Sequence, residues 1–468
     1  MQDRSENAKK IWVLALMSAG SFMVALDALV VTTALNTIRL DTGISIEALQ
    51  WTVNAYNLSF AVLLLTGSAI GDRFGRRRMF AVGMALFMAA SAGCALSYSG
   101  AELIAARAAQ GAGAALIMPI AMALLGTAFP REERAKALGI FSSVTGLALI
   151  AGPVIGGAIA EGIAWQWIFW INLPIGLFVI PLVLRRIQES VGADRTLDFG
   201  GVLLAAGASL GLIWGLMRGN KAGWTSAEVV AALAVGLLLA TVFIAWQLRR
   251  SEPMVPMRFF RSRSFSSGIA ASFLFYASMY GVVFFLPQFL QAAQNFGPLD
   301  AGLRLLPWTA TLFVFAPIGG ALVNRIGERP LVVGGLTVQA IGFAWIALIA
   351  APDRAYGEFV VPLILAGAGV SMAMPAAQNA VLGAVAPMEI GKASGTFNML
   401  RYLGGVFGIA MLGAVFARSG GVGSASAFTD GFIPAVAVAA ALSLFGAMAG
   451  LALPLRRDAA VVQAKAEA

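Results

Sequence analysis

The sequence predicts an all-α membrane protein that crosses the bilayer fourteen times. Of its 468 residues, 59% are hydrophobic and only 12% are charged, whereas about a quarter of the residues in a water-soluble domain are charged. The apolar residues gather in fourteen runs, each long enough to cross the ~30 Å hydrocarbon layer as a helix of about 20 residues. Water therefore cannot be the main solvent of the folded surface.

The rare residue types exclude several classes of protein. The chain has no His and a single Cys, Cys94, which lies in an apolar run. This composition excludes a disulfide framework, a zinc cluster and a Cys–His nucleophile. No phosphate-binding loop is found, since the nearest approach, residues 386–393, lacks the first glycine and the Ser or Thr of that motif. We expect no enzyme, no metal and no cofactor.

The net charge of +9 is explained by membrane topology and gives no reason to expect a nucleic-acid partner. The basic residues lie in short loops between apolar runs and do not form a soluble basic face interleaved with aromatic residues. With fourteen spans both termini share one side, and most Lys and Arg residues fall on that side. The positive-inside rule then predicts a multi-pass protein of the bacterial cytoplasmic (inner) membrane with both termini in the cytoplasm.

The first apolar run, residues 11–36, follows Lys9 and Lys10 as a signal peptide would. It is too long for the apolar region of a signal peptide, it contains Asp27, and many more spans follow it. We interpret it as a retained first helix.

An internal repeat divides the chain. Identical residues of the fourth and twelfth runs recur at a constant spacing of 256 positions: Glu102, Gly111, Gly113, Met118 and Pro119 against Glu358, Gly367, Gly369, Met374 and Pro375. After the loop that follows each run, Lys136 and Gly139 correspond to Lys392 and Gly395 at the same spacing. Such duplication is typical of transporters. We predict two six-helix halves, residues 1–184 and 265–455, joined by a linker with two extra spans, residues 185–264, and a cytoplasmic tail, residues 456–468.

Three short motifs combine glycine with charge or with proline. The loop between the second and third spans contains Gly67, Gly71, Asp72, Arg73, Gly75, Arg76 and Arg77, and a weaker copy between the tenth and eleventh spans has Asn324 in place of the acid. The fourth span carries Arg107, followed by Gln110, Gly111 and Gly113, and the fifth carries Gly152, Pro153, Gly156 and Gly157. Glycine allows close helix contacts and tight turns, and an acid next to arginines can form an ion pair that opens and closes.

These motifs, together with Leu26–Leu35 in the first span and Trp165–Gly176 around the sixth, resemble the major facilitator superfamily and, within it, the fourteen-helix drug:proton antiporters. The resemblance covers nearly the whole chain. It implies that the loop after the second span is a gating motif and that the glycines and Pro153 of the fifth span form the motif associated with antiport. Departures are Ala148 and Gln166, where the family commonly has a glycine and a basic residue.

Asp27 is the one acid well inside a span, and we predict that it carries the coupling proton. A charge inside the membrane is costly and normally marks a functional pair. A nearby cation stabilises the charged form of such a carboxyl, and Arg107 is the partner that we expect. The C-terminal half has no comparable acid and carries Arg401 instead. We expect Arg401 either to bind an anionic group or to pair with Asp27.

Candidate substrate-binding residues are polar or aromatic side chains that are unfavourable against lipid or that share one helix face. They are Tyr56, Tyr276, Tyr280, Phe284, Gln288, Trp308, Gln378, Asn379, Asn398 and Arg401. Packing against lipid remains the alternative for most of the aromatic members.

The sequence thus predicts a proton-coupled efflux antiporter of small amphipathic compounds that works by alternating access. The expected partners are substrate, protons and the lipid bilayer, with the proton gradient as energy source; the sequence leaves open whether a periplasmic adaptor takes part. A proton-coupled importer or lipid transporter of the same fold is the nearest alternative. A non-transporting membrane sensor is a further one, although it would leave the glycine-rich loops and Asp27 without a purpose.

Overall fold

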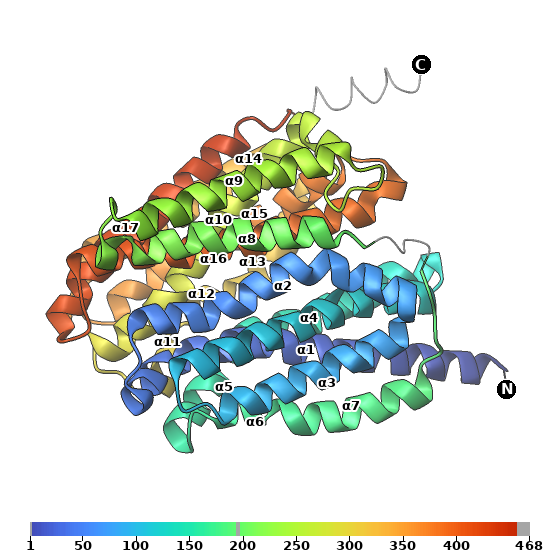
Figure 1. The fold of residues 1–468 in the computed structure, drawn as a ribbon, viewed down its shortest axis with the longest axis horizontal. Coiled ribbons are helices and arrows are strands. Elements are labelled where there is room, and N and C mark those ends of the chain that lie inside the picture. Colours follow the sequence, from blue (N-terminus) through green and yellow to red (C-terminus); the bar gives the residue numbers. More distant parts are fainter. Residues whose placement is uncertain (1, 193–196, 456–468) are drawn as a thin grey trace. The chain divides into compact units, whose positions relative to one another are not determined.

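The computed structural model describes residues 2–192 and 197–455, and Figure 1 shows that this part of the chain is built of helices and loops. No strand occurs among these residues. The predicted cytoplasmic tail, residues 456–468, lies outside the described residues. The all-α fold class is confirmed.

The longer helices follow one another along the whole described chain. They are α1 (Gln2–Thr42), α2 (Ile46–Phe74), α3 (Arg76–Ala95), α4 (Gly100–Ala128), α5 (Arg131–Gly162), α7 (Asn172–Arg186), α8 (Phe199–Ala222), α9 (Ala227–Arg249), α10 (Arg263–Ala292), α13 (Thr311–Ile326), α14 (Glu328–Ile349), α15 (Gly357–Leu382), α16 (Ile390–Ser419) and α17 (Ala425–Gly450). The shorter ones are α6 (Trp167–Trp170), α11 (Pro298–Arg304) and α12 (Leu306–Thr309).

Fourteen stretches of the described chain are long and apolar enough to cross a membrane. Two of them contain more than one helix: α6 and α7 form the sixth stretch, and α11, α12 and most of α13 form the tenth. The number of spans predicted from the sequence is therefore confirmed. Several helices are longer than the apolar runs because they continue past the apolar core into polar residues, as α2 does through Asp72 and Arg73.

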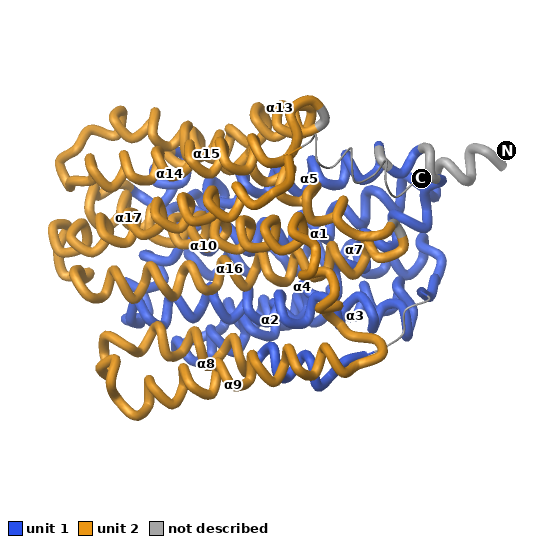
Figure 2. The backbone as a smooth tube through the Cα atoms, turned by 90° about the horizontal axis from the view of Figure 1, so that it is seen from above, with its two compact units in different colours: residues 1–206, 297–303 blue, residues 207–296, 304–468 orange. Residues whose placement is uncertain are grey.

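The chain folds as two compact units (Figure 2). One contains residues 1–206 and 297–303, and the other contains residues 207–296 and 304–468. We call them the N-terminal and C-terminal units. The boundary falls within α8, so that the two extra spans are not a separate body, and α11 is grouped with helices far from it in sequence.

Glycines allow α4 to pack closely on both of its neighbours in the N-terminal unit. A Cβ at Gly111 would lie 2.3 Å from the carbonyl oxygen of Tyr56 on α2. A Cβ at Gly113 would lie 2.9 Å from the carbonyl oxygen of Gly83 on α3. Small residues at such crossings let helix backbones approach where lipid gives no hydrophobic drive for association.

The same arrangement recurs in the C-terminal unit, at the positions that the internal repeat identifies. A Cβ at Gly367 on α15 would lie 2.3 Å from the carbonyl oxygen of Trp308 on α12. A Cβ at Gly369 would lie 2.3 Å from the carbonyl oxygen of Gly335 on α14. The repeated glycines therefore have the same packing role in α4 and α15.

Candidate functional site

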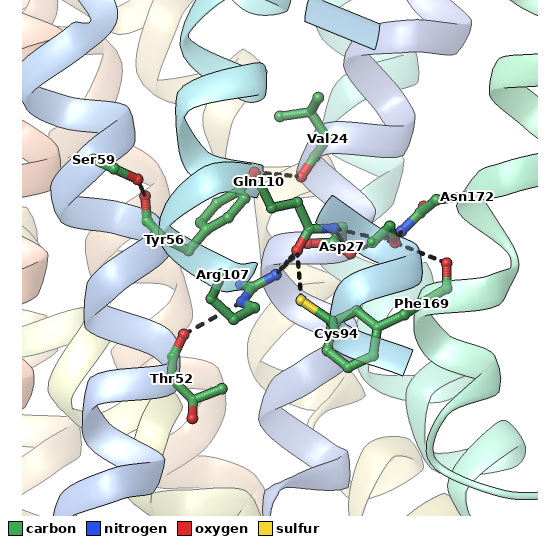
Figure 3. Close-up of polar contacts among 11 residues, drawn as sticks. Val24, Asp27, Thr52, Tyr56, Ser59, Cys94, Arg107, Gln110, Phe169 and Asn172 are labelled. Carbon is green, nitrogen blue, oxygen red and sulfur yellow. Dashed lines mark hydrogen bonds and ion pairs between the residues drawn. The ribbon is translucent and has the colours of Figure 1, made fainter. Parts of the chain in front are cut away.

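Asp27 and Arg107 form a completely buried ion pair in the N-terminal unit (Figure 3). Arg107 Nη1 on α4 donates to Asp27 Oδ2 on α1 at 2.5 Å. Both side chains have 0% of their surface exposed. The contact expected from the sequence is present, whereas the role of Asp27 in carrying a proton stays a prediction.

Two amides and a hydroxyl complete the environment of the carboxylate. Gln110 Nε2 and Asn172 Nδ2 each donate to Asp27 Oδ1 at 2.8 Å. Both amides also donate to Ser91 Oγ, at 3.3 and 2.9 Å, and this hydroxyl donates to the carbonyl oxygen of Phe169 at 2.8 Å. The carboxylate is thereby fixed by amides from α4 and α7, and Ser91 on α3 accepts hydrogen bonds from both amides.

Aromatic rings and a carbonyl group hold Arg107. The guanidinium carbon lies 4.2 Å from the ring centre of Tyr56 and 5.9 Å from that of Phe169. Arg107 Nε donates to the carbonyl oxygen of Thr52 at 3.3 Å, and Nη1 also donates to Gln110 Oε1 at 2.8 Å. Figure 3 shows the Tyr56 ring beside the guanidinium, and the Tyr56 hydroxyl donates to the carbonyl oxygen of Val24 at 3.1 Å.

The electrostatic balance of this cluster depends on the charge of Asp27. Removing one partner of a buried ion pair leaves an uncompensated charge and typically costs about 3–5 kcal/mol. Arg107 Nη2 and Asn172 Oδ1 are buried and have no hydrogen-bond partner among the described residues. The cluster therefore retains one buried donor and one buried acceptor that no described residue uses.

The glycines of the fifth span pack α5 against the helix that carries Asp27. A Cβ at Gly152 would lie 2.7 Å from Leu29 Cβ, and one at Gly156 would lie 2.3 Å from the carbonyl oxygen of Val30. These contacts lie within one turn of Asp27 on α1. Pro153 lies inside α5 between the two glycines.

Gly157 makes a different contact, with α11. A Cβ there would lie 2.3 Å from the carbonyl oxygen of Pro298. In return, a Cβ at Gly302 on α11 would lie 2.3 Å from the carbonyl oxygen of Pro153. The motif on α5 thus contacts both α1 and α11.

The predicted gating motif turns sharply at Gly75, whose φ of 104° is accessible mainly to glycine. Asp72 Oδ1 accepts a hydrogen bond from Arg76 Nε at 2.7 Å, so that the acid of the motif pairs with an arginine as expected. Gly67 and Gly71 face α4, where a Cβ would meet Ala115 and Ile120. Arg73 is exposed, and its guanidinium carbon lies 5.3 Å from the ring centre of Phe74.

A second acid, Glu189, binds the start of α3. Its carboxylate accepts hydrogen bonds from the backbone N–H groups of Arg77 at 2.9 Å and Arg78 at 3.3 Å. The Nε atoms of the same two arginines lie 3.8 and 3.6 Å from it. An acid at a helix N-terminus satisfies free N–H groups and interacts favourably with the helix dipole.

The segment around Glu189 follows the loop closely, and we call residues 187–192 the strap. The backbone N–H of Arg76 donates to the carbonyl oxygen of Ser190 at 2.8 Å, and that of Gly192 donates to the carbonyl oxygen of Asp72 at 3.0 Å. A Cβ at Gly192 would lie 2.0 Å from the Asp72 carboxyl carbon. The strap therefore holds the gating motif by backbone and side-chain contacts.

The candidate substrate residues are distributed over both compact units. Tyr56 belongs to the Asp27 cluster. Tyr276, Tyr280 and Arg401 lie together in the C-terminal unit, in an aromatic cluster with Tyr402. Within the C-terminal unit, the Arg401 guanidinium lies against the rings of Tyr276 and Tyr402.

The other candidates have local contacts. Phe284 is fully buried against Phe285, Trp308 packs edge-on against Phe343, and the buried Gln288 donates to the carbonyl oxygen of its own-helix neighbour Phe284 at 2.7 Å. Asn379 is exposed and donates to Glu328 Oε1 at 2.7 Å, at the second copy of the gating loop. Gln378 is half-buried, as is Asn398, which donates to the carbonyl oxygen of Ser394 on the preceding turn.

Sequence reasoning missed several residues of the site. Asn172 and Gln110 stood inside recognised motifs, and a polar amide in an apolar span was the signal that could have identified them. Ser91 had no such signal, because serines are common in spans. Glu189 was missed since nothing in its neighbourhood indicates that the linker folds back onto the start of α3.

Comparisons with known proteins agree with this architecture. A family model described as Major Facilitator Superfamily matches residues 17–409 and 268–468. The chain is 33% identical over 413 residues to "Multidrug resistance protein Stp" of Mycobacterium tuberculosis (strain CDC 1551 / Oshkosh), an alignment that covers 88% of this chain and 76% of that protein. It is 34% identical over 440 residues to "Cephamycin export protein CmcT" of Amycolatopsis lactamdurans, covering 92% and 90%.

A solved structure with the same fold is a POT family transporter in complex with 5-aminolevulinic acid. The TM-score is 0.69 over 92% of this chain and 94% of that one. The sequences are 15% identical, so this likeness concerns the fold alone.

Proposed function

Because the chain belongs to the major facilitator superfamily, we propose that it exports small amphipathic, drug-like compounds in exchange for protons. The observation that carries the proposal is the buried Asp27–Arg107 pair, in which a titratable acid is held inside a membrane span by groups from several helices. Relatives named as multidrug resistance and cephamycin export proteins support export as the direction.

The hydrogen bonds indicate where a proton would bind. Asp27 Oδ1 already accepts two amide N–H groups, whereas Oδ2 accepts only from Arg107. We therefore expect the proton on Oδ2. Its arrival replaces the ion pair by a neutral carboxyl group beside an arginine that has lost its counter-ion.

This loss of pairing would favour a different arrangement of the helices around Arg107. The strongest mechanical link is through α5, because Gly152 and Gly156 contact α1 next to Asp27 while Gly157 contacts α11. Proton binding in one access state and proton release on substrate binding in the other would then couple export to the proton gradient. Each proton that moves through 100 mV supplies about 2.3 kcal/mol.

We place the protein in the bacterial cytoplasmic (inner) membrane, with both termini in the cytoplasm. The fourteen apolar stretches support a multi-pass membrane protein. The concentration of Lys and Arg on the side of the termini supports the orientation.

Flux measurements in proteoliposomes test the proposal. The purified full chain is reconstituted with an imposed pH gradient and three probes: ethidium, 9-anthracenemethanol and 9-anthracenecarboxylate. We expect gradient-driven accumulation of at least one probe, and we expect Asp27→Asn to abolish it. The matched control is Asp41→Asn on the same helix, where the carboxylate accepts a hydrogen bond from Trp165 Nε1 at 2.7 Å. Full uphill transport by Asp27→Asn would refute the assignment.

A further inference from the structure

The C-terminal unit contains an arginine whose surroundings differ from those of Arg107. Arg401 Nη2 on α16 donates to the Tyr402 hydroxyl at 3.1 Å. Its guanidinium carbon lies 4.8 Å from the ring centre of Tyr402 and 5.0 Å from that of Tyr276 on α10. The ring centre of Tyr280 lies 6.2 Å from that of Tyr276 and 6.4 Å from that of Tyr402. Two tyrosine rings therefore lie against the cation and a third packs on both of them, and we call these four residues the tyrosine cage.

The cage depends on a close crossing of α10 and α16. A Cβ at Gly405 would lie 2.9 Å from the Tyr280 ring, and one at Gly408 would lie 1.9 Å from the carbonyl oxygen of Ala277. Gly405 follows Arg401 by one helical turn. Glycine at these positions leaves room for the aromatic rings beside the arginine.

Within the described part of the C-terminal unit, the Arg401 guanidinium contacts tyrosines and forms no ion pair with a carboxylate. Aromatic rings attract a cation through their quadrupole but do not neutralise it. The contrast with Arg107 is direct, because that arginine is paired with Asp27 at 2.5 Å.

Two polar groups of the cage also lack partners. Arg401 Nε and the Tyr276 hydroxyl are both buried without a hydrogen-bond partner among the described residues. Tyr276 is 3% exposed, so water does not easily replace the missing partner. A buried donor that is left unpaired is costly, and a bound group that accepts from both donors would remove that cost.

We propose that the tyrosine cage binds the anionic group of an aromatic acid and that aromatic anions are therefore a substrate class of this exporter. The inference rests on the proposed function. A carboxylate or sulfonate accepts charge-assisted hydrogen bonds from the planar guanidinium, and the Tyr276 hydroxyl supplies a further donor. The rings of Tyr280 and Tyr402 supply apolar faces for the aromatic body of the substrate. A cationic substrate would meet an unpaired arginine and is disfavoured at this site.

Equilibrium binding tests the inference without any gradient. Isothermal titration calorimetry on the full chain in neutral detergent uses 9-anthracenecarboxylate, the uncharged 9-anthracenemethanol, and a trimethylammonium derivative of the same ring. We expect the affinity to fall in the order anion, neutral compound, cation. We expect Arg401→Gln to weaken binding of the acid by about 10- to 100-fold, which is the range for a hydrogen bond to a charged group. Binding of the alcohol should change by less than about threefold, which also reports that the variant is folded.

Further variants separate the charge of Arg401 from its shape. Arg401→Lys should retain part of the preference for the acid. Tyr276→Phe should lower the affinity for the acid more than the affinity for the alcohol. The matched control is Arg304→Gln, since the Arg304 guanidinium carbon also lies over an aromatic ring, 3.7 Å from the centre of Phe296. This control should leave the order of the three probes unchanged.

Several outcomes would overturn the inference. Equal affinity for acid and alcohol, a preference for the cation, or an equal effect of Arg304→Gln would each do so. Displacement of the acid by dioleoylphosphatidylglycerol at equal potency would instead assign the cage to a lipid headgroup. These experiments measure binding and not transport. The preference for the acid can therefore be absent while Asp27-dependent flux persists, and it can be present even where flux is not coupled to protons.

Discussion

Replacing Gly156 by alanine should separate α5 from α1 and impair transport. The added Cβ would lie 2.3 Å from the carbonyl oxygen of Val30 and 2.6 Å from Thr33 Oγ1. Ordinary contacts of a Cβ begin near 3.4 Å, so α5 must move away by about 1 Å. Overpacking of this kind typically costs about 1–3 kcal/mol.

A glycine on the same helix provides the control. A Cβ at Gly146 meets nothing within 4 Å. Alanine there should be neutral or should stabilise the helix by up to about 1 kcal/mol, since glycine in a helix interior is unfavourable by that amount. The two variants differ by ten positions on one helix and make the same chemical change.

Thermal unfolding and flux together decide the outcome. The apparent Tm of purified Gly156→Ala should fall by about 2–4 °C for each kcal/mol lost in a unit of this size. Its gradient-driven flux should fall as well, while Gly146→Ala keeps both. Equal Tm values and equal flux for the two variants would refute the idea that α5 transmits movement to α1 through this contact.

The remaining predictions concern the environment of Asp27 and the strap. Asn172→Leu removes a hydrogen bond to the buried Asp27 carboxylate, which should lower the free energy of unfolding by about 1.5–3 kcal/mol and reduce gradient-driven flux; an unchanged Tm together with unchanged flux would contradict this. Tyr56→Phe should keep the free energy of unfolding within about 1 kcal/mol of the wild-type value, whereas Tyr56→Leu should lower it by about 2 kcal/mol through the lost cation–π contact; thermal unfolding measures both. Glu189→Ala should lower the free energy of unfolding by about 1 kcal/mol as a lost helix cap, and Glu189→Gln, which keeps one acceptor oxygen, should lower it less; equal losses in the two variants would assign this contact of the strap to charge alone.

Much of the fold could be predicted from the sequence because membrane spans obey a simple physical rule. Lipid cannot hydrogen-bond to the backbone, so each apolar run must form a helix of spanning length. The internal repeat also had a direct structural meaning, since Gly111 and Gly367 pack on equivalent neighbours. Helix ends were less accurate because polar residues such as Asp72 and Arg73 continue α2 beyond the apolar run.

The Asp27–Arg107 pairing could be expected because each charge inside a membrane needs a partner. The hydrogen bonds from the amides of Gln110 and Asn172 could not be predicted in the same way, because an uncharged amide does not require a partner of opposite charge. Contacts such as Glu189 with the backbone of Arg77 are set by how a linker folds back, which apolar periodicity does not determine. The surroundings of the substrate candidates could not be predicted either. The residue type indicated that Trp308 and Phe284 avoid solvent, but it did not indicate which neighbours bury them.

Proton release on substrate binding tests the central claim most directly. The purified full chain in weakly buffered detergent solution is mixed with each of the three flux probes, and a pH-indicator dye records protons that appear in solution. The account predicts that a transported probe releases protons from the wild-type protein and that Asp27→Asn abolishes this signal while Asp41→Asn keeps it. Proton release of normal size from Asp27→Asn would show that another group carries the proton and would contradict the account.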